Sequence, residues 1–107
     1  MANTYVNAKL DLTTTNITTL YTCAALTKGI VKSILVAEDS GNADTITVTL
    51  TNSSSSVFVL FNVKSVAANT TVELLSAPLV LEAGEILKVT AATANRLHVV
   101  ASILEVT

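Results

Sequence analysis

The sequence predicts an all-β fold, a single antiparallel β-sandwich of eight to nine strands with jelly-roll or immunoglobulin-like topology. Three observations favour this class. Threonine, valine and isoleucine make up 37 of the 107 residues, and such β-branched side chains fit a pleated sheet better than a helix. Apolar side chains recur at every second position more often than at every third or fourth. Turn residues interrupt this pattern about every ten residues, as in sandwiches and jelly rolls.

Four strands are predicted in the first half of the chain. Residues 4–12 alternate apolar and polar side chains, and a threonine-rich loop separates them from a shorter strand at 18–24. Residues 30–38 are apolar on both faces and end at the turn 39–42, where glycine and asparagine accept positive φ easily. Residues 45–51 alternate isoleucine, valine and leucine with threonine. We therefore expect that strand to have one dry face and one face lined by hydroxyl groups.

Strand 30–38 also gives a specific prediction about side-chain direction. Simple alternation places Ile30, Ile34 and Val36 on its better apolar face. The opposite face then carries four further side chains: Val31, Ser33, Leu35 and Ala37.

The second half of the chain repeats the pattern with five predicted strands of different lengths. Residues 57–64 begin with an apolar run, and a strand at 70–75 follows a polar turn. The piece 78–81 starts with the only proline, which suits the start or the edge of a strand. Residues 86–92 and 96–106 complete the sandwich.

Length and charge define the broad class. A chain of 107 residues and 11.1 kDa is one domain, here 1–107, with a short N-terminal arm expected at 1–5. The net charge of −2 argues against a nucleic-acid or anionic-membrane binder. No apolar run approaches the length of a membrane span, and the first residues do not resemble a secretion signal.

The candidate chemical groups are few, and each has a simpler structural interpretation. His98 has no sequence partners for a triad or zinc site, so we expect it on a wet face or at an interface. Cys23 has no neighbouring cation, which favours a buried, inert thiol over a nucleophile.

The carboxylates allow two interpretations each. Residues 38–44 loosely fit a calcium loop, but turn chemistry explains the same side chains and is favoured. Glu82 and Glu85 could pair as acid and base, although they flank a glycine turn and fit solvated turn charges better. We therefore expect no enzyme activity, no catalytic residue, no cofactor and no metal site.

A surplus of apolar side chains is the strongest positive indication of function. Half of the residues are hydrophobic and only 13% are charged, so a sandwich this small leaves apolar area exposed. Contiguous exposed patches usually mark partner surfaces, although the two sheets and their loops could instead cover these side chains. The expected interface residues are Met1, Ala2, Asn3, Thr4, Tyr5, Leu35, Phe58 and Leu60.

The order and spacing of several segments resemble small structural proteins of tailed bacteriophages. The segments read YVNA to LTT in 5–14, TLYT in 19–22, GIVKSI in 29–34, PLVLEAGEILKV in 78–89 and HVVASILE in 98–105. Such proteins are similar to jelly-roll or immunoglobulin-like modules that decorate or cement capsids, or belong to tails and fibres. The resemblance implies no catalytic residues.

The resemblance implies a location in the virion, which is assembled in the host cytoplasm. It implies a capsid cement or decoration protein that binds the major capsid protein, or another virion protein, across subunit joints. A homotrimer or another homo-oligomer is the expected state, with the arm at 1–5 reaching a neighbour. A tail, baseplate or fibre module is the alternative. A carbohydrate-binding module is a distant third, because sugar stacking normally needs exposed aromatic side chains and the chain has no tryptophan.

Overall fold

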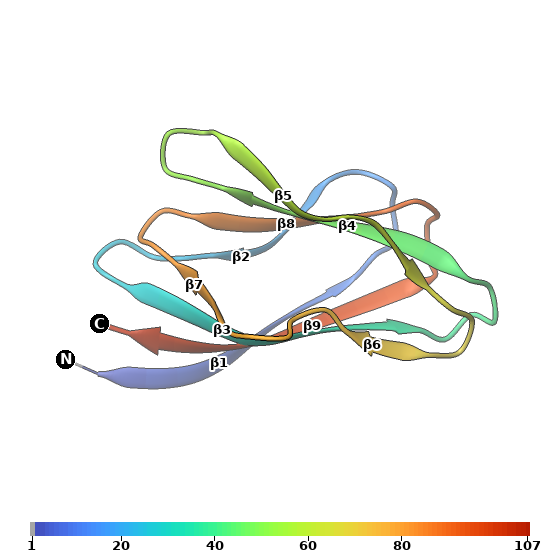
Figure 1. The fold of residues 1–107 in the computed structure, drawn as a ribbon, viewed down its shortest axis with the longest axis horizontal. Helices are drawn as coiled ribbons and strands as arrows, with labels where there is room; N and C mark the ends of the chain where they lie inside the picture. The colour runs from blue at the N-terminus through green and yellow to red at the C-terminus, as the bar shows by residue number, and fades with distance from the viewer. Residues whose placement is uncertain (1) are drawn as a thin grey trace.

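The computed structural model describes residues 2–107, and it confirms the all-β sandwich (Figure 1). In these residues nine strands form two antiparallel sheets that face each other. The strands are β1 (Asn3–Asp11), β2 (Thr18–Thr22), β3 (Lys28–Glu38), β4 (Asp44–Thr51), β5 (Val57–Val66), β6 (Thr71–Glu73), β7 (Leu79–Leu81), β8 (Ile86–Ala91) and β9 (Leu97–Val106).

The strand order is that of a jelly roll. The first sheet has the order β1-β9-β3-β6, with β7 also pairing with β3, and the second sheet has the order β2-β8-β4-β5. The pairs are nested: β1 with β9, β2 with β8, β3 with β6 and β7, and β4 with β5. A long hairpin rolled up on itself gives this nesting, whereas an immunoglobulin domain groups its strands differently.

The core lies between the sheets and follows the predicted alternation. Ile46, Val48 and Leu50 of β4 are buried, while the three threonines between Asp44 and Leu50 are only half-buried and face outward. Val99 and Ala101 of β9, in the first sheet, are fully buried as well. Burying one such aliphatic side chain stabilises a fold by roughly 1.5–3 kcal/mol, so this alternation fixes the register of both sheets.

The side-chain directions predicted for the start of β3 are wrong. Val31 is fully buried and Ile30 is half-buried, the reverse of simple alternation. The reason is a β-bulge: Val31 pairs with Ile103 and Ser33 pairs with Ser102, so Lys32 is an extra residue. An extra residue shifts the alternation by one position, so Ile30 faces outward.

The beginning of the chain belongs to the sheet. Asn3, Thr4 and Tyr5 are the first residues of β1 and pair with Val106, Glu105 and Leu104 of β9. The backbone amide of Ala2 donates a hydrogen bond of 3.1 Å to the hydroxyl of Thr107. Residues 2–5 therefore continue an edge strand instead of leaving the sandwich as a free arm, and Met1 lies outside the described residues.

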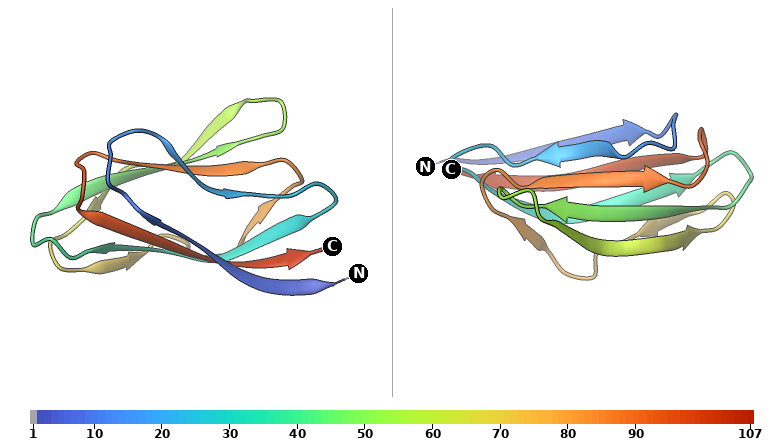
Figure 2. Two further views of the ribbon diagram at one scale, coloured as in Figure 1. Left: turned by 180° about the vertical axis from the view of Figure 1, so that it is seen from behind. Right: turned by 90° about the horizontal axis from the view of Figure 1, so that it is seen from above.

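The two chain ends lie side by side at one end of the sandwich (Figure 2). A hydrogen bond joins the two sheets there, because the hydroxyl of Tyr21 in β2 donates to Glu105 in β9 at 2.5 Å. A Cβ atom on Gly29 would lie 3.2 Å from the Tyr21 ring, so glycine leaves the space that the ring uses. Burial and the neighbouring Glu105 carboxylate both raise the pKa of Tyr21.

Candidate functional site

Large apolar side chains are exposed in two separate surfaces. One is the outer face of the first sheet, and the other lies on β5 at the open edge of the second sheet. Ile17 and Leu26 are also exposed, but they are isolated in loops. Contiguous apolar area of this kind is typical of a binding surface.

The outer face of the first sheet is ordered in rows that cross the strands. Tyr5 of β1 pairs with Leu104 of β9, Leu104 with Ile30 of β3, and Ile30 with Val80 of β7. We call these four residues the apolar row. Tyr5 is 74% exposed and Val80 is 50% exposed, so the row is open to solvent at both edges.

A second row lies further from the chain ends. Lys9 pairs with Val100, Val100 with Leu35, and Leu35 with Glu73 of β6. We call these residues the mixed row, since a cation and an anion flank two apolar side chains. Between the two rows lie small polar side chains, those of Asn7, Ser102 and Ser33.

Glu73 holds its place in the mixed row through backbone contacts. Its carboxylate accepts hydrogen bonds from the amides of Ile34 at 2.8 Å and Leu75 at 3.1 Å. Burial alone would raise the pKa of Glu73, but the hydrogen bonds from Ser33 and these amides outweigh burial and lower the pKa. The row therefore has a fixed negative charge at its β6 edge.

The second surface, which we call the β5 patch, consists of Val57, Phe58, Val59 and Val63. All four side chains are more than half exposed. The end of the β4–β5 hairpin projects from the sandwich (Figure 2, left), so the opposite sheet does not cover Val57 and Val59. The exposure of both valines is not evident from the sequence, because alternation does not show where a hairpin extends past the other sheet.

The expected interface residues fall into three groups. Tyr5, Leu35 and Phe58 are exposed members of the two surfaces, and the preceding residues Ala2, Asn3 and Thr4 are exposed as well. Leu60 is half-buried and packs against the core. It is the extra residue of a second bulge, since Val48 pairs with Phe61 and Thr49 with Val59. Met1 lies outside the described residues.

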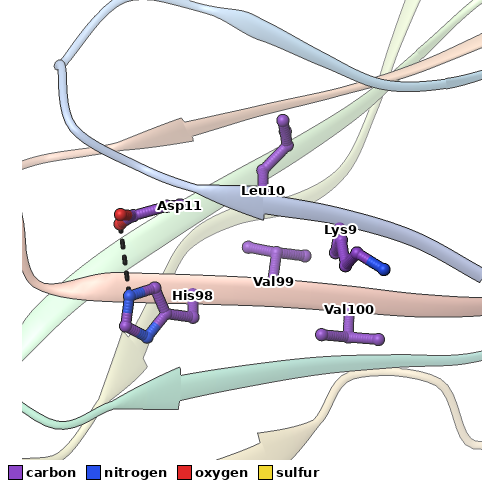
Figure 3. A pocket seen from close by; sticks show the side chains of 6 residues that line it. All are labelled: Lys9, Leu10, Asp11, His98, Val99 and Val100. Carbon is purple, nitrogen blue, oxygen red and sulfur yellow. Dashed lines mark ion pairs between the residues drawn. The ribbon is translucent and has the colours of Figure 1, made fainter.

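His98 lies on the outer face of the first sheet, between the carboxylates of Asp11 and Asp39. Figure 3 shows the contact with Asp11. Its Nε2 is 3.2 Å from Oδ1 of Asp11, and its Nδ1 is 3.7 Å from Oδ2 of Asp39. Asp11 pairs with His98 across β1 and β9, a proximity that the linear sequence does not show. The two carboxylates approach opposite ring nitrogens, so they do not converge on one ligand position.

A shallow hollow of about 280 Å³ lies beside His98, between β1 and β9. Three residues of each strand line it: Lys9, Leu10 and Asp11 of β1, and His98, Val99 and Val100 of β9. In residues 2–107, no serine, threonine or cysteine side chain is hydrogen-bonded to the His98 ring, and a nucleophile in reach is what triad chemistry requires. The geometry fits a solvent-exposed contact between His98 and Asp11 on the outer face of the sheet.

Cys23 is buried, as the sequence predicts. Its thiol donates to the carbonyl oxygens of Thr27 at 3.3 Å and Leu81 at 3.7 Å. Burial raises the pKa of the Cys23 thiol, which disfavours the reactive thiolate. The thiol packs the end of the sandwich where β2, β3 and β7 meet.

Glu38 organises the turn after β3. Its carboxylate accepts hydrogen bonds from the amides of Ser40 at 2.9 Å, Gly41 at 3.1 Å and Asn69 at 3.1 Å, and from the Ser40 hydroxyl. Burial would raise the pKa of Glu38, but these hydrogen bonds outweigh it and lower the pKa to about 2. Turn chemistry thus accounts for the acidic residue that opens the 38–44 segment. Within the described part of the chain, no three His, Cys, Asp or Glu side chains form a metal-binding group.

Glu82 and Glu85 also take part in turn structure. The Glu82 carboxylate forms an exposed ion pair with Lys28. Oε1 of Glu85 accepts a hydrogen bond of 2.7 Å from the Glu82 amide, which closes the turn before β8. The two carboxylates thus have different partners, which fits the interpretation of both as solvated charges of a turn.

The sequence matches no protein-family model and no curated protein. Among residues 2–107, no helix has the length and apolar character needed to cross a membrane. The apolar row, the mixed row and the β5 patch are therefore the features from which a function is inferred.

Proposed function

We propose that this protein is a non-enzymatic structural protein of a phage virion, a cement or decoration protein that binds across joints between capsid subunits. The resemblance of its segments to small virion proteins suggests the setting. The observation that carries the proposal is the β5 patch, which has three consecutive exposed apolar residues and a fourth, Val63, at an open sheet edge. A strand edge with apolar side chains binds partners or aggregates unless it is covered, and a shell would cover it.

The remaining surface suits a protein on the outside of a particle. Thr45, Thr47 and Thr49 of β4 line the outer face of the second sheet, and Thr47 pairs with Thr90 of β8. These hydroxyl groups keep that face hydrated. A protein that binds the assembled shell but not its free subunits stabilises the shell by mass action.

The proposal is tested by adding the purified protein to preformed heads that lack it. We expect Phe58→Ser to lower the affinity for heads about tenfold or more, because a buried aromatic anchor contributes about 2 kcal/mol or more to an interface. The matched control is Ile17→Ser, which changes an exposed apolar residue near the opposite edge of the second sheet. Ile17→Ser should bind like the natural protein.

Binding that is unchanged by Phe58→Ser would exclude the β5 patch as the shell contact. Electron microscopy of virions carrying the labelled protein distinguishes the head from the tail, baseplate or fibre. A label found only on tails would favour the alternative module over a cement protein.

A further inference from the structure

We propose that two copies of this chain associate face to face through the outer faces of their first sheets, about a twofold axis that runs parallel to the strands. The occupant of this face is thus a second copy of the same protein. This proposal concerns a different surface from the β5 patch and does not depend on the virion role.

The axis follows from the order of strands in the sheet. A twofold axis that lies in the interface and runs along the strands exchanges the two edges of the sheet, the β1 edge and the β6–β7 edge. It therefore places β1 of one copy over β6 and β7 of the other, and β9 over β3. Each row then lies on the same row of the partner, because positions along the strands are unchanged.

In this arrangement the apolar row is complementary to itself. Tyr5 of one copy faces Val80 of the second copy, and Leu104 faces Ile30. Each of these side chains points away from the core of its own copy, so the contact buries apolar area that the sandwich itself leaves uncovered.

The mixed row is complementary in charge as well as in polarity. Lys9 at the β1 edge of one copy faces Glu73 at the β6 edge of the second, and symmetry repeats this pair. Val100 faces Leu35 between the two pairs. Paired opposite charges at the rim of an apolar centre fix the register of two surfaces.

The other face-to-face twofold axis, perpendicular to the strands, gives a poor match. It lays the apolar row of one copy on the mixed row of the other, so Tyr5 faces Lys9 and Val80 faces Glu73. Apolar side chains then cover charged ones, so the charges lose their contact with water and gain no partner of opposite charge. The rows therefore select the parallel axis.

The size of the face predicts a weak dimer. The two rows are four residue steps apart and cross four strands, which is about 13 Å by 15–19 Å in projection. This is less than the roughly 800 Å² per partner of a typical stable interface. The exposed Lys32, the extra residue of the β3 bulge, lies between the two rows, and its charge makes the face more polar. We therefore expect association in the micromolar range.

Sedimentation equilibrium of the full chain at protein concentrations from about 10 μM to about 1 mM tests the dimer. The natural protein should change from monomer to dimer across this range. Leu35→Lys and, separately, Lys9→Glu should each weaken association about tenfold or more, the first by a buried charge and the second by repulsion from Glu73. Adding Glu73→Gln to Lys9→Glu should restore part of the loss, since glutamine keeps an oxygen for the Ile34 amide.

The matched control is Val59→Lys, which places the same charge at an exposed apolar position of the β5 patch and should leave the dimer unchanged. Circular dichroism tests whether each variant remains folded, and Lys9→Glu changes an exposed residue. A monomer at all concentrations overturns the proposal, as does a trimer. A dimer that survives Leu35→Lys, or that is lost only with Val59→Lys, also overturns it.

Discussion

Glu38 shows how one buried charge determines a turn in this protein. A carboxylate that is only 2% exposed is costly unless it is hydrogen-bonded, and three backbone amides and one hydroxyl supply those bonds. Two of these amides belong to the β3–β4 connection and one, from Asn69, to the β5–β6 connection. Glu38 therefore joins two loops that each cross from one sheet to the other.

This arrangement predicts acid sensitivity. The pKa of Glu38 is lowered from 4.5 to about 2, so its contribution to stability is complete above about pH 4.5 and is lost as the pH falls towards 2. Glu38→Gln should lower the free energy of unfolding at neutral pH. It should also make that free energy depend less on pH between 4.5 and 2. Urea unfolding at a series of pH values measures both effects.

The matched control is Glu82→Gln, which changes an exposed carboxylate in another turn. It should keep the acid dependence of the natural chain. If Glu38→Gln retained the full loss of stability between pH 4.5 and 2, the turn network would not be its source.

At the scale of elements, bulges decide which side chains reach the two surfaces. The β3 bulge turns Ile30 outward into the apolar row, and a bulge at Leu60 turns that residue inward. A third bulge leaves Asn62 and Val63 of β5 opposite Thr47. Bulges at an edge also increase twist and discourage edge-to-edge pairing, which an open strand such as β5 needs.

The third bulge contains a strained residue and gives a stability prediction. Val63 has a φ of 51°, and its amide donates to the Thr47 hydroxyl at 3.1 Å. A β-branched residue in this region costs about 1–2 kcal/mol, whereas asparagine tolerates it. Val63→Asn should raise the free energy of unfolding by about 1 kcal/mol, because the valine side chain is largely exposed and little burial is lost.

Thermal and urea unfolding of Val63→Asn, compared with Val59→Asn, measures this effect. Val59 is about as exposed as Val63 and lies on the same strand, but its φ is not positive. Its replacement by asparagine should therefore not stabilise the fold. A Val63→Asn variant that is less stable than the natural protein would contradict the claim that the positive φ of Val63 strains the backbone.

For the whole molecule, the sequence predicts the fold class and the nine strands well, since alternation and turn spacing are local properties. Alternation also identifies the hydroxyl-lined face of β4 and the exposure of Leu35 and Phe58. It does not predict the rows, because neighbours across a jelly roll are far apart in sequence. Ile30 beside Val80, and His98 beside Asp11, arise only from the strand order.

The whole-molecule consequence is that the two sheets differ on their outer faces. The second sheet presents threonine hydroxyl groups, while the first presents the apolar row and the mixed row. A core of this size is filled from the inner faces alone, so the outer apolar side chains stay exposed unless another molecule covers them.

Methyl NMR spectra of the natural protein, recorded dilute and concentrated, test this central claim most directly. We predict that raising the concentration shifts the methyl signals of Leu35, Val100 and Leu104, whereas those of Val57 and Val59 stay in place. Signals that do not move at any concentration, or movement confined to the two β5 valines, would contradict the claim.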